Sequence, residues 1–415
     1  MEELLVKPNG KLSGSVEVSG SKNSSLPIMA ACLLCEGKNR IYNVPDLSDI
    51  TTMCHLLDES GASVSKGEGY LDIDCNHISN RLCEYSMSNK LRGSFLLSGP
   101  LLARLGKVKI PMPGGCPIGT RPIDLHLKGF SALGAEISKG HGYVELKSKK
   151  LVGNKIYLDF PSVGATENII MAAVLAEGDT IIENTATEPE IEDLTNFLNS
   201  QGAKIEGSGT DTIIIHGVES LSPTTHTVIP DRIEAGTFLI ALAITGGCGT
   251  VKNINSEHIK PVCAKLKEMG YFLEFKENSV YIDAEKSIHQ TDIKTLPFPG
   301  FPTDMQAPFS ALLSTIKGTG IVIETVFENR FLHVGELVRM GAHIKIDGRT
   351  SVIEGVKHLT GADVTAYDLR GGASLVLAGT VAKGKTKISG FEHIKRGYEK
   401  FPQKLKKLGA DIEII

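Results

Sequence analysis

The chain has 415 residues, of which 41% are hydrophobic and 22% charged, and a formal net charge of −4. This length exceeds a single ordinary core, so we expect two domains. The acidic balance argues against a nucleic-acid-binding protein, which normally presents a basic face. Any anionic ligand must therefore be held by lysine and arginine side chains placed locally.

Targeting signals and cysteine patterns add little to this picture. The apolar runs 26–34 and 237–245 are about half as long as the roughly 20 residues that a membrane-spanning helix requires. The first residues are acidic where a secretory signal is basic. Cys32 and Cys35 have the spacing of a metal or redox pair, but they lie in an apolar run and are interpreted as core residues. We expect a cytoplasmic protein with free thiols, without membrane insertion.

A helix end followed by Gly and a short apolar strand recurs six times. The six glycines are separated by 73, 68, 68, 71 and 68 residues. Glycine is the expected residue just past a helix end, where the backbone turns left-handed. The glycines are Gly61, Gly134, Gly202, Gly270, Gly341 and Gly409. The sequence therefore predicts six repeats that cover nearly the whole chain.

Each repeat also contains an apolar, Ala-rich helix that precedes the amphipathic one. A helix that is apolar all round is buried, whereas an amphipathic helix is half exposed, so the sheets should lie outside the apolar helices. Each repeat then follows the order βαβαββ. We predict an α/β (α+β) fold of two inside-out barrels with three repeats each, although the repeats alone also fit a six-repeat solenoid. The apolar helices lie within 25–44, 94–113, 168–185, 236–254, 307–325 and 373–390.

The first two candidate site motifs begin apolar helices. Lys22 and Asn23 follow serines and precede Pro27, a pattern that predicts a helix start. Free backbone N–H groups at such a start favour an anion, so Lys22 is a candidate phosphate ligand; a solvated lysine in a capping loop is the alternative. Arg92 enters the apolar helix of the second repeat, where a cation opposes the helix dipole. An anion bound by Arg92 would explain this, and so would a surface arginine.

The third motif is a loop over 111–122. It holds four prolines and three glycines, which rule out a helix and a central strand. Cys116 lies at its middle and Arg121 follows five residues later. Because a nearby cation favours the thiolate, Cys116 is a candidate reactive group. A chance cysteine in a surface loop is the alternative.

Together these motifs resemble the UDP-N-acetylglucosamine enolpyruvyl transferase family. The resemblance starts from Gly20-Ser21-Lys22-Asn23 and from the loop 113–122 followed by Asp124-Leu125-His126, and it extends over essentially the whole chain. It implies transfer of the enolpyruvyl group of phosphoenolpyruvate to the 3'-hydroxyl of UDP-N-acetylglucosamine, with release of phosphate. It implies no metal, organic cofactor, nucleic acid or obligatory protein partner. Later matching motifs are 162–166, 188–191, 230–234, 301–306, 328–331, 368–370 and 396–399.

The resemblance also implies roles for individual residues. Cys116 would donate the proton and can form an adduct with phosphoenolpyruvate, and Asp304 would face the sugar hydroxyl as base or orienting group. Asn23 would position the tetrahedral centre. The expected ligands of phosphoenolpyruvate are Lys22, Arg121 and Arg396, with Arg92 and Arg370 nearby. The expected nucleotide-sugar residues are Arg121, Pro122, Ile123, Asp124, Leu125, Ser162, Val163 and Val326.

The resemblance places residues 22–229 in one three-repeat domain that carries the Cys116 loop. It places 1–21 and 230–415 in a second, with the first strand completing the last repeat and the active site in the cleft between the domains. One departure concerns Phe160, where some relatives carry lysine: this ring would pack against the uracil or fill core.

Several motifs also have structural interpretations. Thr187-x-x-Glu190 and Thr303-x-x-Gln306 match the capping box, and Asp231 is a natural N-cap, so these groups and Glu188 would close helix starts. Two rival functions remain: the sister family acting on shikimate 3-phosphate, and a catalytically inactive regulatory paralogue. The Cys116 loop with the run from Arg121 to His126 favours the nucleotide sugar.

Overall fold

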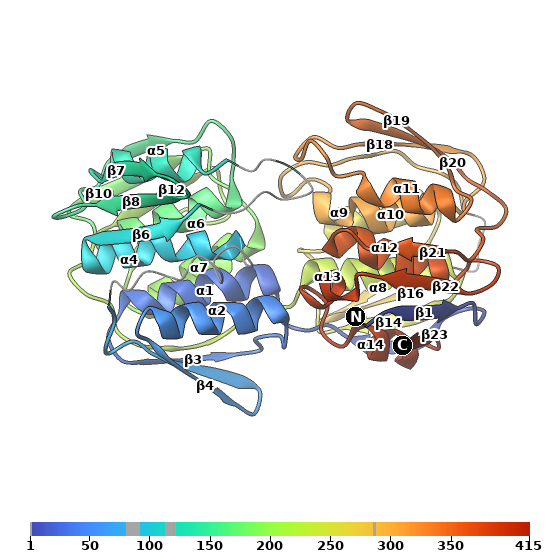
Figure 1. The fold of residues 1–415 in the computed structure, drawn as a ribbon, viewed down its shortest axis with the longest axis horizontal. Helices are drawn as coiled ribbons and strands as arrows, with labels where there is room; N and C mark the ends of the chain where they lie inside the picture. The colour runs from blue at the N-terminus through green and yellow to red at the C-terminus, as the bar shows by residue number, and fades with distance from the viewer. Residues whose placement is uncertain (1, 80–91, 113–118, 120–121, 285–287) are drawn as a thin grey trace. The chain divides into compact units, whose positions relative to one another are not determined.

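The computed structural model (Figure 1) describes residues 2–79, 92–112, 119, 122–284 and 288–415. Contacts within the chain divide it into two compact lobes. We call the lobe formed by Gly20–Gly115 and Arg121–Ile229 the N lobe. The C lobe combines Met1–Ser19 with Pro230–Ile415, and the described residue Gly119 is grouped with it. Apart from the short segment around Gly119, the chain passes between lobes after Ser19 and again after Ile229.

The N lobe contains three repeats. The first comprises α1 (Lys22–Ala31), η1 (Cys32–Leu34), β3 (Lys38–Tyr42), α2 (Ser48–Glu59), β4 (Ser63–Gly67) and β5 (Tyr70–Asp74). The second comprises η2 (Arg92–Leu97), α4 (Ser98–Leu105), β6 (Lys107–Pro111), α5 (Asp124–Ala132), β7 (Glu136–Gly140) and β8 (Tyr143–Lys147). The third comprises β9 (Lys155–Tyr157), α6 (Val163–Ala173), β10 (Asp179–Glu183), α7 (Pro189–Ser200), β11 (Lys204–Glu206) and β12 (Thr212–His216), followed by β13 (Thr225–Thr227).

The C lobe begins with β1 (Leu4–Lys7) and β2 (Ser13–Glu17). Its first repeat continues with α8 (Arg232–Ile244), β14 (Cys248–Lys252), α9 (Lys260–Glu268), β15 (Phe272–Lys276) and β16 (Ser279–Asp283). The next comprises β17 (Ile293–Lys294), η3 (Thr303–Met305), α10 (Gln306–Leu313), β18 (Thr319–Ile323), α11 (Leu332–Arg339), β19 (His343–Asp347) and β20 (Thr350–Glu354). The last comprises β21 (Asp363–Thr365), α12 (Leu369–Gly379), β22 (Thr386–Ser389), α13 (Phe391–Lys395), α14 (Phe401–Lys407) and β23 (Asp411–Ile414).

The predicted βαβαββ order is confirmed, most plainly by the third repeat from β9 to β12. The six repeat glycines have φ angles between 90° and 104°. This left-handed region is costly for residues with a Cβ, and it ends each amphipathic helix so that the next strand can begin. The spacing of these glycines thus gave the length of the repeat correctly, and each glycine lies between the second helix and the last two strands of its repeat.

Each repeat contributes one sheet, and the first two strands of the chain complete sheets in the C lobe. β1 lies between β22 and β23 and runs antiparallel to both, while β2 runs parallel to β14. In the N lobe, β13 returns to run parallel to β3. The chain therefore closes each lobe by pairing strands that are far apart in sequence.

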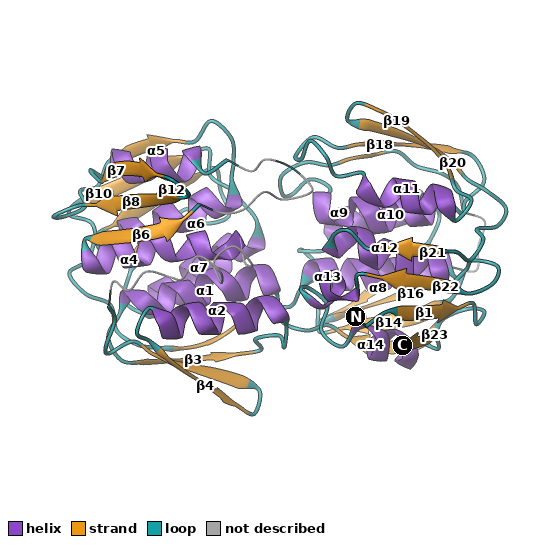
Figure 2. Cartoon of the chain, in the orientation of Figure 1, coloured by secondary structure: helices purple, strands orange, loops and turns teal. Residues whose placement is uncertain are grey.

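Helices lie inside each lobe and sheets lie outside, as predicted (Figure 2). All residues of α8 from Ile233 to Ile244 are buried, and so is α6 from Ala165 to Ala173. One amphipathic helix differs from the expectation of half exposure, because the polar residues Glu190, Asp193 and Thr195 of α7 are buried as well. Within the described part of the chain, no helix combines the length and hydropathy needed to cross a bilayer.

Candidate functional site

The N-terminus of α1 carries the first pair of candidate residues. Ser21 is the N-cap, and its side chain accepts a hydrogen bond from Ser24 N. Lys22 Nζ lies 3.2 Å from Asp49 Oδ2, in a pair whose side chains are 12% and 6% exposed. Asn23 is exposed on the same turn. The helix start predicted from the serines is confirmed, and it brings a cation and an amide to the end of a helix whose free N–H groups favour anions.

Asp193, a buried residue of α7, accepts a hydrogen bond from the first turn of α1. Ser24 Oγ donates a hydrogen bond to Asp193 Oδ2, and Ile229 N donates to the same oxygen over 3.2 Å. His226 Nε2 lies 2.8 Å from Asp193 Oδ1. Asp193 is 3% exposed, so its carboxylate has little access to water and relies on these three groups as hydrogen-bond partners. These contacts explain how Asp193 can be buried on α7, and no local sequence pattern indicated them.

The predicted nucleotide-sugar residues of the N lobe occupy two other helix starts. Ile123 precedes α5 and is buried, Asp124 begins α5 and is exposed, and Leu125 is half-buried against the core. Ser162 caps α6 by accepting a hydrogen bond from Ala165 N, and Val163 is the first residue of that helix. A Cβ on Gly164 would lie 3.3 Å from the ring of His126 in α5, so these two starts are neighbours.

The two residues that flank these helix starts are exposed. Pro122 lies on the surface before α5. Phe160 has 42% of its surface exposed two residues before the Ser162 cap. The alternative that Phe160 fills core is therefore wrong, because the loop that carries it leaves the ring in solvent.

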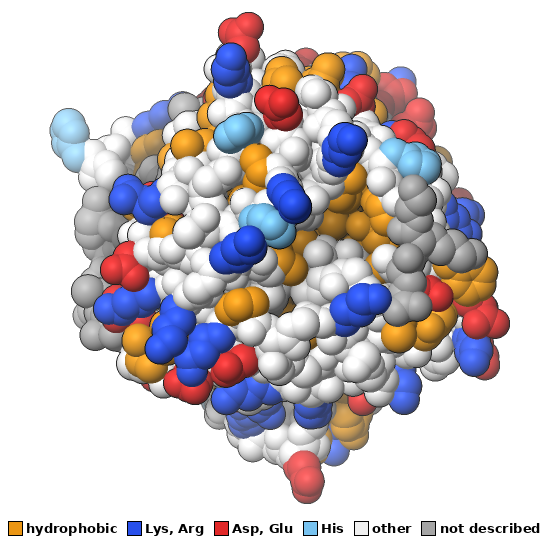
Figure 3. Space-filling model, turned by 90° about the vertical axis from the view of Figure 1, so that its right-hand side faces the viewer, with side chains coloured by type: hydrophobic (Ala, Val, Ile, Leu, Met, Phe, Trp, Pro, Cys, Tyr) orange, Lys and Arg blue, Asp and Glu red, His pale blue; other side chains and the backbone are white. Residues whose placement is uncertain are grey.

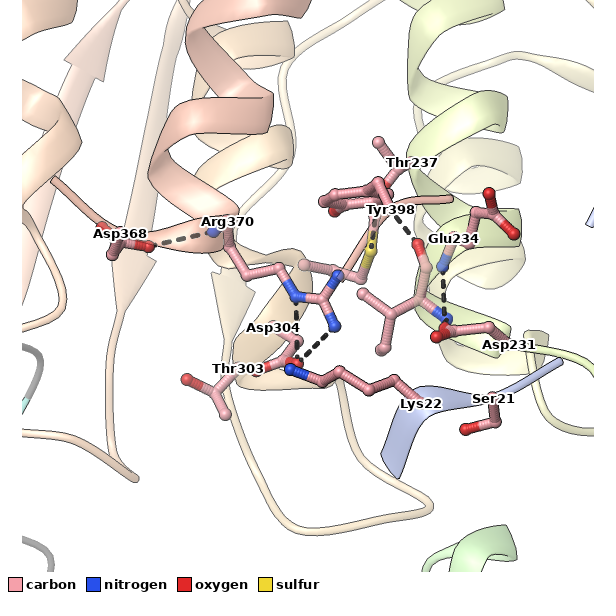
Figure 4. Close-up of polar contacts among 12 residues, drawn as sticks. Ser21, Lys22, Asp231, Glu234, Thr237, Thr303, Asp304, Asp368, Arg370 and Tyr398 are labelled. Atoms are coloured by element: carbon pink, nitrogen blue, oxygen red, sulfur yellow. Dashed lines mark hydrogen bonds and ion pairs between the residues drawn. The ribbon is translucent and has the colours of Figure 1, made fainter. Parts of the chain in front are cut away.

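In the C lobe, Asp304 is bound by two arginines, Arg330 and Arg370, and the contacts of Arg370 are drawn in Figure 4. Arg330 Nη2 donates to Asp304 Oδ1 over 2.6 Å. Arg370 donates to Oδ2 from both Nε and Nη2, over 3.1 and 3.0 Å. The two guanidinium side chains are 6% and 3% exposed, whereas Asp304 is 24% exposed. The carboxylate is thus fixed in orientation by charge-assisted hydrogen bonds while part of it stays open to solvent.

The capping-box interpretation of Thr303 is wrong, because its hydroxyl binds elsewhere. Thr303 Oγ1 donates to Glu324 Oε2 and accepts from Arg330 Nη1, both over 2.8 Å. Glu324 Oε1 accepts from Val326 N over 2.8 Å and thereby fixes the loop that carries Val326. This network ties the predicted nucleotide-sugar residue Val326 to the turn that holds Asp304.

Arg370 lies in the first turn of α12, behind the N-cap Asp368, which accepts from Arg370 N and Gly371 N. Burial opposes the charge of the Arg370 guanidinium, but Tyr398, Asp304 and Asp231 outweigh this and raise its pKa above the ordinary value. Arg396 follows α13 and is half-buried, two residues before Tyr398. The tyrosine hydroxyl lies 2.9 Å from Thr237 Oγ1. Buried polar groups thus converge around the first turn of α12.

Asp231 caps α8 as predicted and accepts hydrogen bonds from Ile233 N and Glu234 N. Glu188 immediately precedes α7 and does not cap it through its side chain, and the capping box over 187–190 stays a prediction. Glu234 accepts from Ser19 N over 2.6 Å and from Lys404 Nζ over 2.7 Å. Burial raises the pKa of Glu234 to about 7, although Lys404 acts in the opposite direction.

Three predicted residues cannot be placed in this way. Cys116 and Arg121 lie outside the described residues, and Arg92 begins η2 without a described side chain. Across the described ranges, no group of three or more His, Cys, Asp or Glu side chains is arranged to hold a metal ion. Sequence reasoning missed Asp49 and the role of Arg330. An acid in the first turn of α2 was the available signal for Asp49, and the 328–331 motif was the signal for Arg330.

The family model described as EPSP synthase (3-phosphoshikimate 1-carboxyvinyltransferase) matches residues 6–405. The UDP-N-acetylglucosamine 1-carboxyvinyltransferase 1 of Caldanaerobacter subterraneus subsp. tengcongensis is 55% identical over 99% of both chains. The UDP-N-acetylglucosamine 1-carboxyvinyltransferase 2 of Carboxydothermus hydrogenoformans is 54% identical over 100% of both chains.

Solved structures agree with the fold. The enolpyruvyl transferase NikO from Streptomyces tendae superposes with a TM-score of 0.90 at 24% identity, covering 100% of this chain and 98% of that one. An EPSP synthase from Acinetobacter baumannii gives a TM-score of 0.76 at 20% identity and covers both chains fully. These likenesses support the fold alone, because their sequence identity is low.

Proposed function

Because this chain belongs to the UDP-N-acetylglucosamine 1-carboxyvinyltransferase family, we propose that it transfers the enolpyruvyl group of phosphoenolpyruvate to the 3'-hydroxyl of UDP-N-acetylglucosamine. Phosphate is the second product, and the reaction is the first committed step of peptidoglycan precursor synthesis. The observation that carries this function is identity of 54–55% to relatives of that name over 99–100% of both chains. The matched stretches extend over 99–100% of this chain.

The reaction is an addition followed by an elimination. The sugar hydroxyl oxygen bonds to C2 of phosphoenolpyruvate, its proton leaves, and the methylene carbon gains a proton to become a methyl group. The tetrahedral product then loses a proton from this methyl group and expels phosphate, which restores the double bond. The enzyme therefore needs one group that exchanges a proton with carbon and another near the sugar hydroxyl.

We assign to Cys116 the exchange of a proton with the methylene carbon, and we assign to Asp304 the role of base or orienting group for the sugar hydroxyl. The geometry that supports the second assignment is the fixed orientation of Asp304 by Arg330 and Arg370 together with its remaining exposure. A carboxylate whose position is set by two buried arginines can orient a hydroxyl without reorganising during the reaction.

The phosphate and the carboxylate of phosphoenolpyruvate are anions, so we expect cationic side chains to bind them. We propose Lys22, Arg121 and Arg396 as its ligands, with Arg92 and Arg370 nearby and Asn23 beside the tetrahedral centre. The support is the position of Lys22 at a capped helix start and of Arg370 in the first turn of α12. Ionic hydrogen bonds of this type stabilise charge that develops in the transition state.

The nucleotide sugar is assigned to the starts of α5 and α6 and to the Val326 loop. Ile123, Asp124, Leu125, Ser162 and Val163 form adjacent backbone turns, and Phe160 offers an exposed ring for the uracil. Binding of both substrates between the two predicted domains stays a prediction. We further propose a cytoplasmic location, because the six described cysteines are free thiols, as is typical of a reducing compartment.

The test is phosphate release from phosphoenolpyruvate, measured in parallel with UDP-N-acetylglucosamine and with shikimate 3-phosphate. We expect release with the nucleotide sugar alone. Release with the shikimate ester alone would be consistent with the fold but would contradict the proposed substrate. Release with neither would favour an inactive paralogue, and mass spectrometry of the enolpyruvyl product would exclude simple hydrolysis of phosphoenolpyruvate.

A further inference from the structure

The C-terminal ends of the central helices in the C lobe enclose a hollow of about 290 Å³. Ile244 is the last residue of α8, Ile316 follows α10 and Val381 follows α12, and all three line the hollow. Tyr271 and Leu359 add further apolar surface. The candidate site residues Asp231, Asp304 and Arg370 lie at or before the opposite, N-terminal ends of the same helices. The hollow is therefore separate from the proposed reaction site by the length of these helices.

Basic residues lie at one edge of the hollow. Lys357 and His358 line it, and slight desolvation together with the charges of Lys383 and Lys357 lowers the pKa of His358. Over the described residues, neither lysine forms an ion pair with a carboxylate. Figure 3 looks onto this face, where hydrophobic side chains lie in the depression and basic side chains and histidines lie around it. In a chain with net charge −4, this local excess of cations is unusual.

At the C-terminal ends of its central helices, the N lobe carries a cationic side chain where the C lobe carries apolar ones. Arg104, two residues before the Gly106 that ends α4, donates to Leu33 O, Cys35 O and Cys75 O over 2.8–2.9 Å. Its guanidinium thus spans the helix ends of that lobe. The corresponding residues of the C lobe, two positions before Gly246 and Gly318, are Ile244 and Ile316. The C lobe thus has apolar residues where the N lobe has a long cationic side chain bound to three backbone carbonyls.

We propose that this hollow binds a small amphipathic anion, with its apolar body against Ile244, Ile316 and Tyr271 and its anionic group at Lys357 and Lys383. The volume is at the lower end of the range for small-molecule pockets, which suits a chain of medium length or one ring. Burial of apolar surface supplies affinity, and the rim lysines select an anionic head group over a neutral one. The ligand is a free molecule, distinct from both substrates of the proposed reaction.

The probe is octyl phosphate below its micelle concentration, titrated calorimetrically into the full-length protein. Octanol and inorganic phosphate serve as the tail alone and the head alone. We expect binding of octyl phosphate that weakens as salt rises, and weaker or no binding of either fragment. If octanol bound as tightly as octyl phosphate, the lysines would not recognise an anionic group. If inorganic phosphate bound as tightly, the apolar residues would not contribute to binding. Absence of octyl phosphate binding at millimolar concentration would overturn the proposal.

Two variants locate the binding. The double variant K357Q/K383Q should weaken octyl phosphate binding about tenfold, because exposed cations each contribute modestly, while K276Q, on an exposed strand end of the same lobe, should not. I316R copies the side chain that spans the N lobe and should abolish binding. Phosphate release should remain in K357Q/K383Q, which separates failure of this site from failure of the proposed function. Unchanged binding in both variants, or binding only to anionic lipid vesicles, would contradict the assignment.

Discussion

Lys22 and Asp49 form an ion pair at the start of α1, with Nζ 3.2 Å from Oδ2 and both side chains largely buried. Asp49 lies in the first turn of α2, so the pair joins the starts of two helices in the first repeat. If Lys22 binds phosphoenolpyruvate, Asp49 is the group that orients it.

The variant Asp49→Asn removes this charge partner and tests its role. Since a hydrogen bond to a charged group contributes about 1.5–3 kcal/mol, we expect the KM for phosphoenolpyruvate to rise about tenfold or more. The matched control is Asp46→Asn, which breaks the exposed Lys66–Asp46 pair and should leave KM unchanged. Equal effects of the two variants on steady-state kinetics would exclude orientation of Lys22 by Asp49.

The Asp304→Asn variant tests the group assigned to the sugar hydroxyl. The amide keeps the volume of the side chain but cannot accept a proton, so we expect kcat to fall about 100-fold or more, within the range for loss of a general acid–base. Arg330→Lys should have a smaller effect in the same direction, because lysine cannot reproduce the two contacts of Arg330 with Asp304 and Thr303. Normal kcat in Asp304→Asn would remove this residue from the mechanism.

Glu234 gives a pH-dependent contribution to stability. Burial raises its pKa in the folded protein from the ordinary 4.5 to about 7, so between these pH values the folded state holds a proton that the unfolded state has released. This contribution is fully present below about pH 4.5 and is lost as the pH rises through 7. It amounts to about 3 kcal/mol at most.

The measurement is chemical denaturation of the protein and of Glu234→Gln from pH 4.5 to 8. The difference in unfolding free energy between the two should fall steadily over this range and level off above pH 7. Burial lowers the pKa of His333 to about 4, so the contribution of His333 to stability changes with pH in the opposite direction. Because His333 is present in both proteins, its contribution cancels in the difference. A difference independent of pH would show that Glu234 stays ionised.

Phe160 tests the nucleotide-sugar assignment. Its exposed ring contributes little to the core, so Phe160→Ala should leave the melting temperature within about 2 °C. If the ring packs on the uracil, KM for the nucleotide sugar should rise about fivefold, as expected for loss of about 1 kcal/mol of aromatic contact. An unchanged KM would mean that the ring does not touch the nucleotide.

Cys116 is tested by alkylation. Fosfomycin, an epoxide analogue of phosphoenolpyruvate, should inactivate the enzyme and add its mass to the peptide that contains Cys116. Cys116→Asp should resist and retain activity, because an acid remains at that position. Full inhibition of this variant would place the target elsewhere.

Local patterns in the sequence were sufficient for the repeated fold. A glycine after every amphipathic helix and an apolar helix in every repeat are properties of short segments, and their recurrence predicted both the βαβαββ order and the buried position of α6 and α8. The Ser21 and Asp231 caps were equally predictable, since a cap depends on a few adjacent residues.

Tertiary structure decided what surrounds the candidate residues. Arg330 and Arg370 reach Asp304 across 26 and 66 positions, and Ser24 reaches Asp193 across 169. No pattern within one segment encodes such partners, because they are set by how separate repeats pack. The same reason explains the incorrect capping box at Thr303: the spacing to Gln306 was right, but the hydroxyl binds Glu324 and Arg330, which only the folded lobe brings within reach.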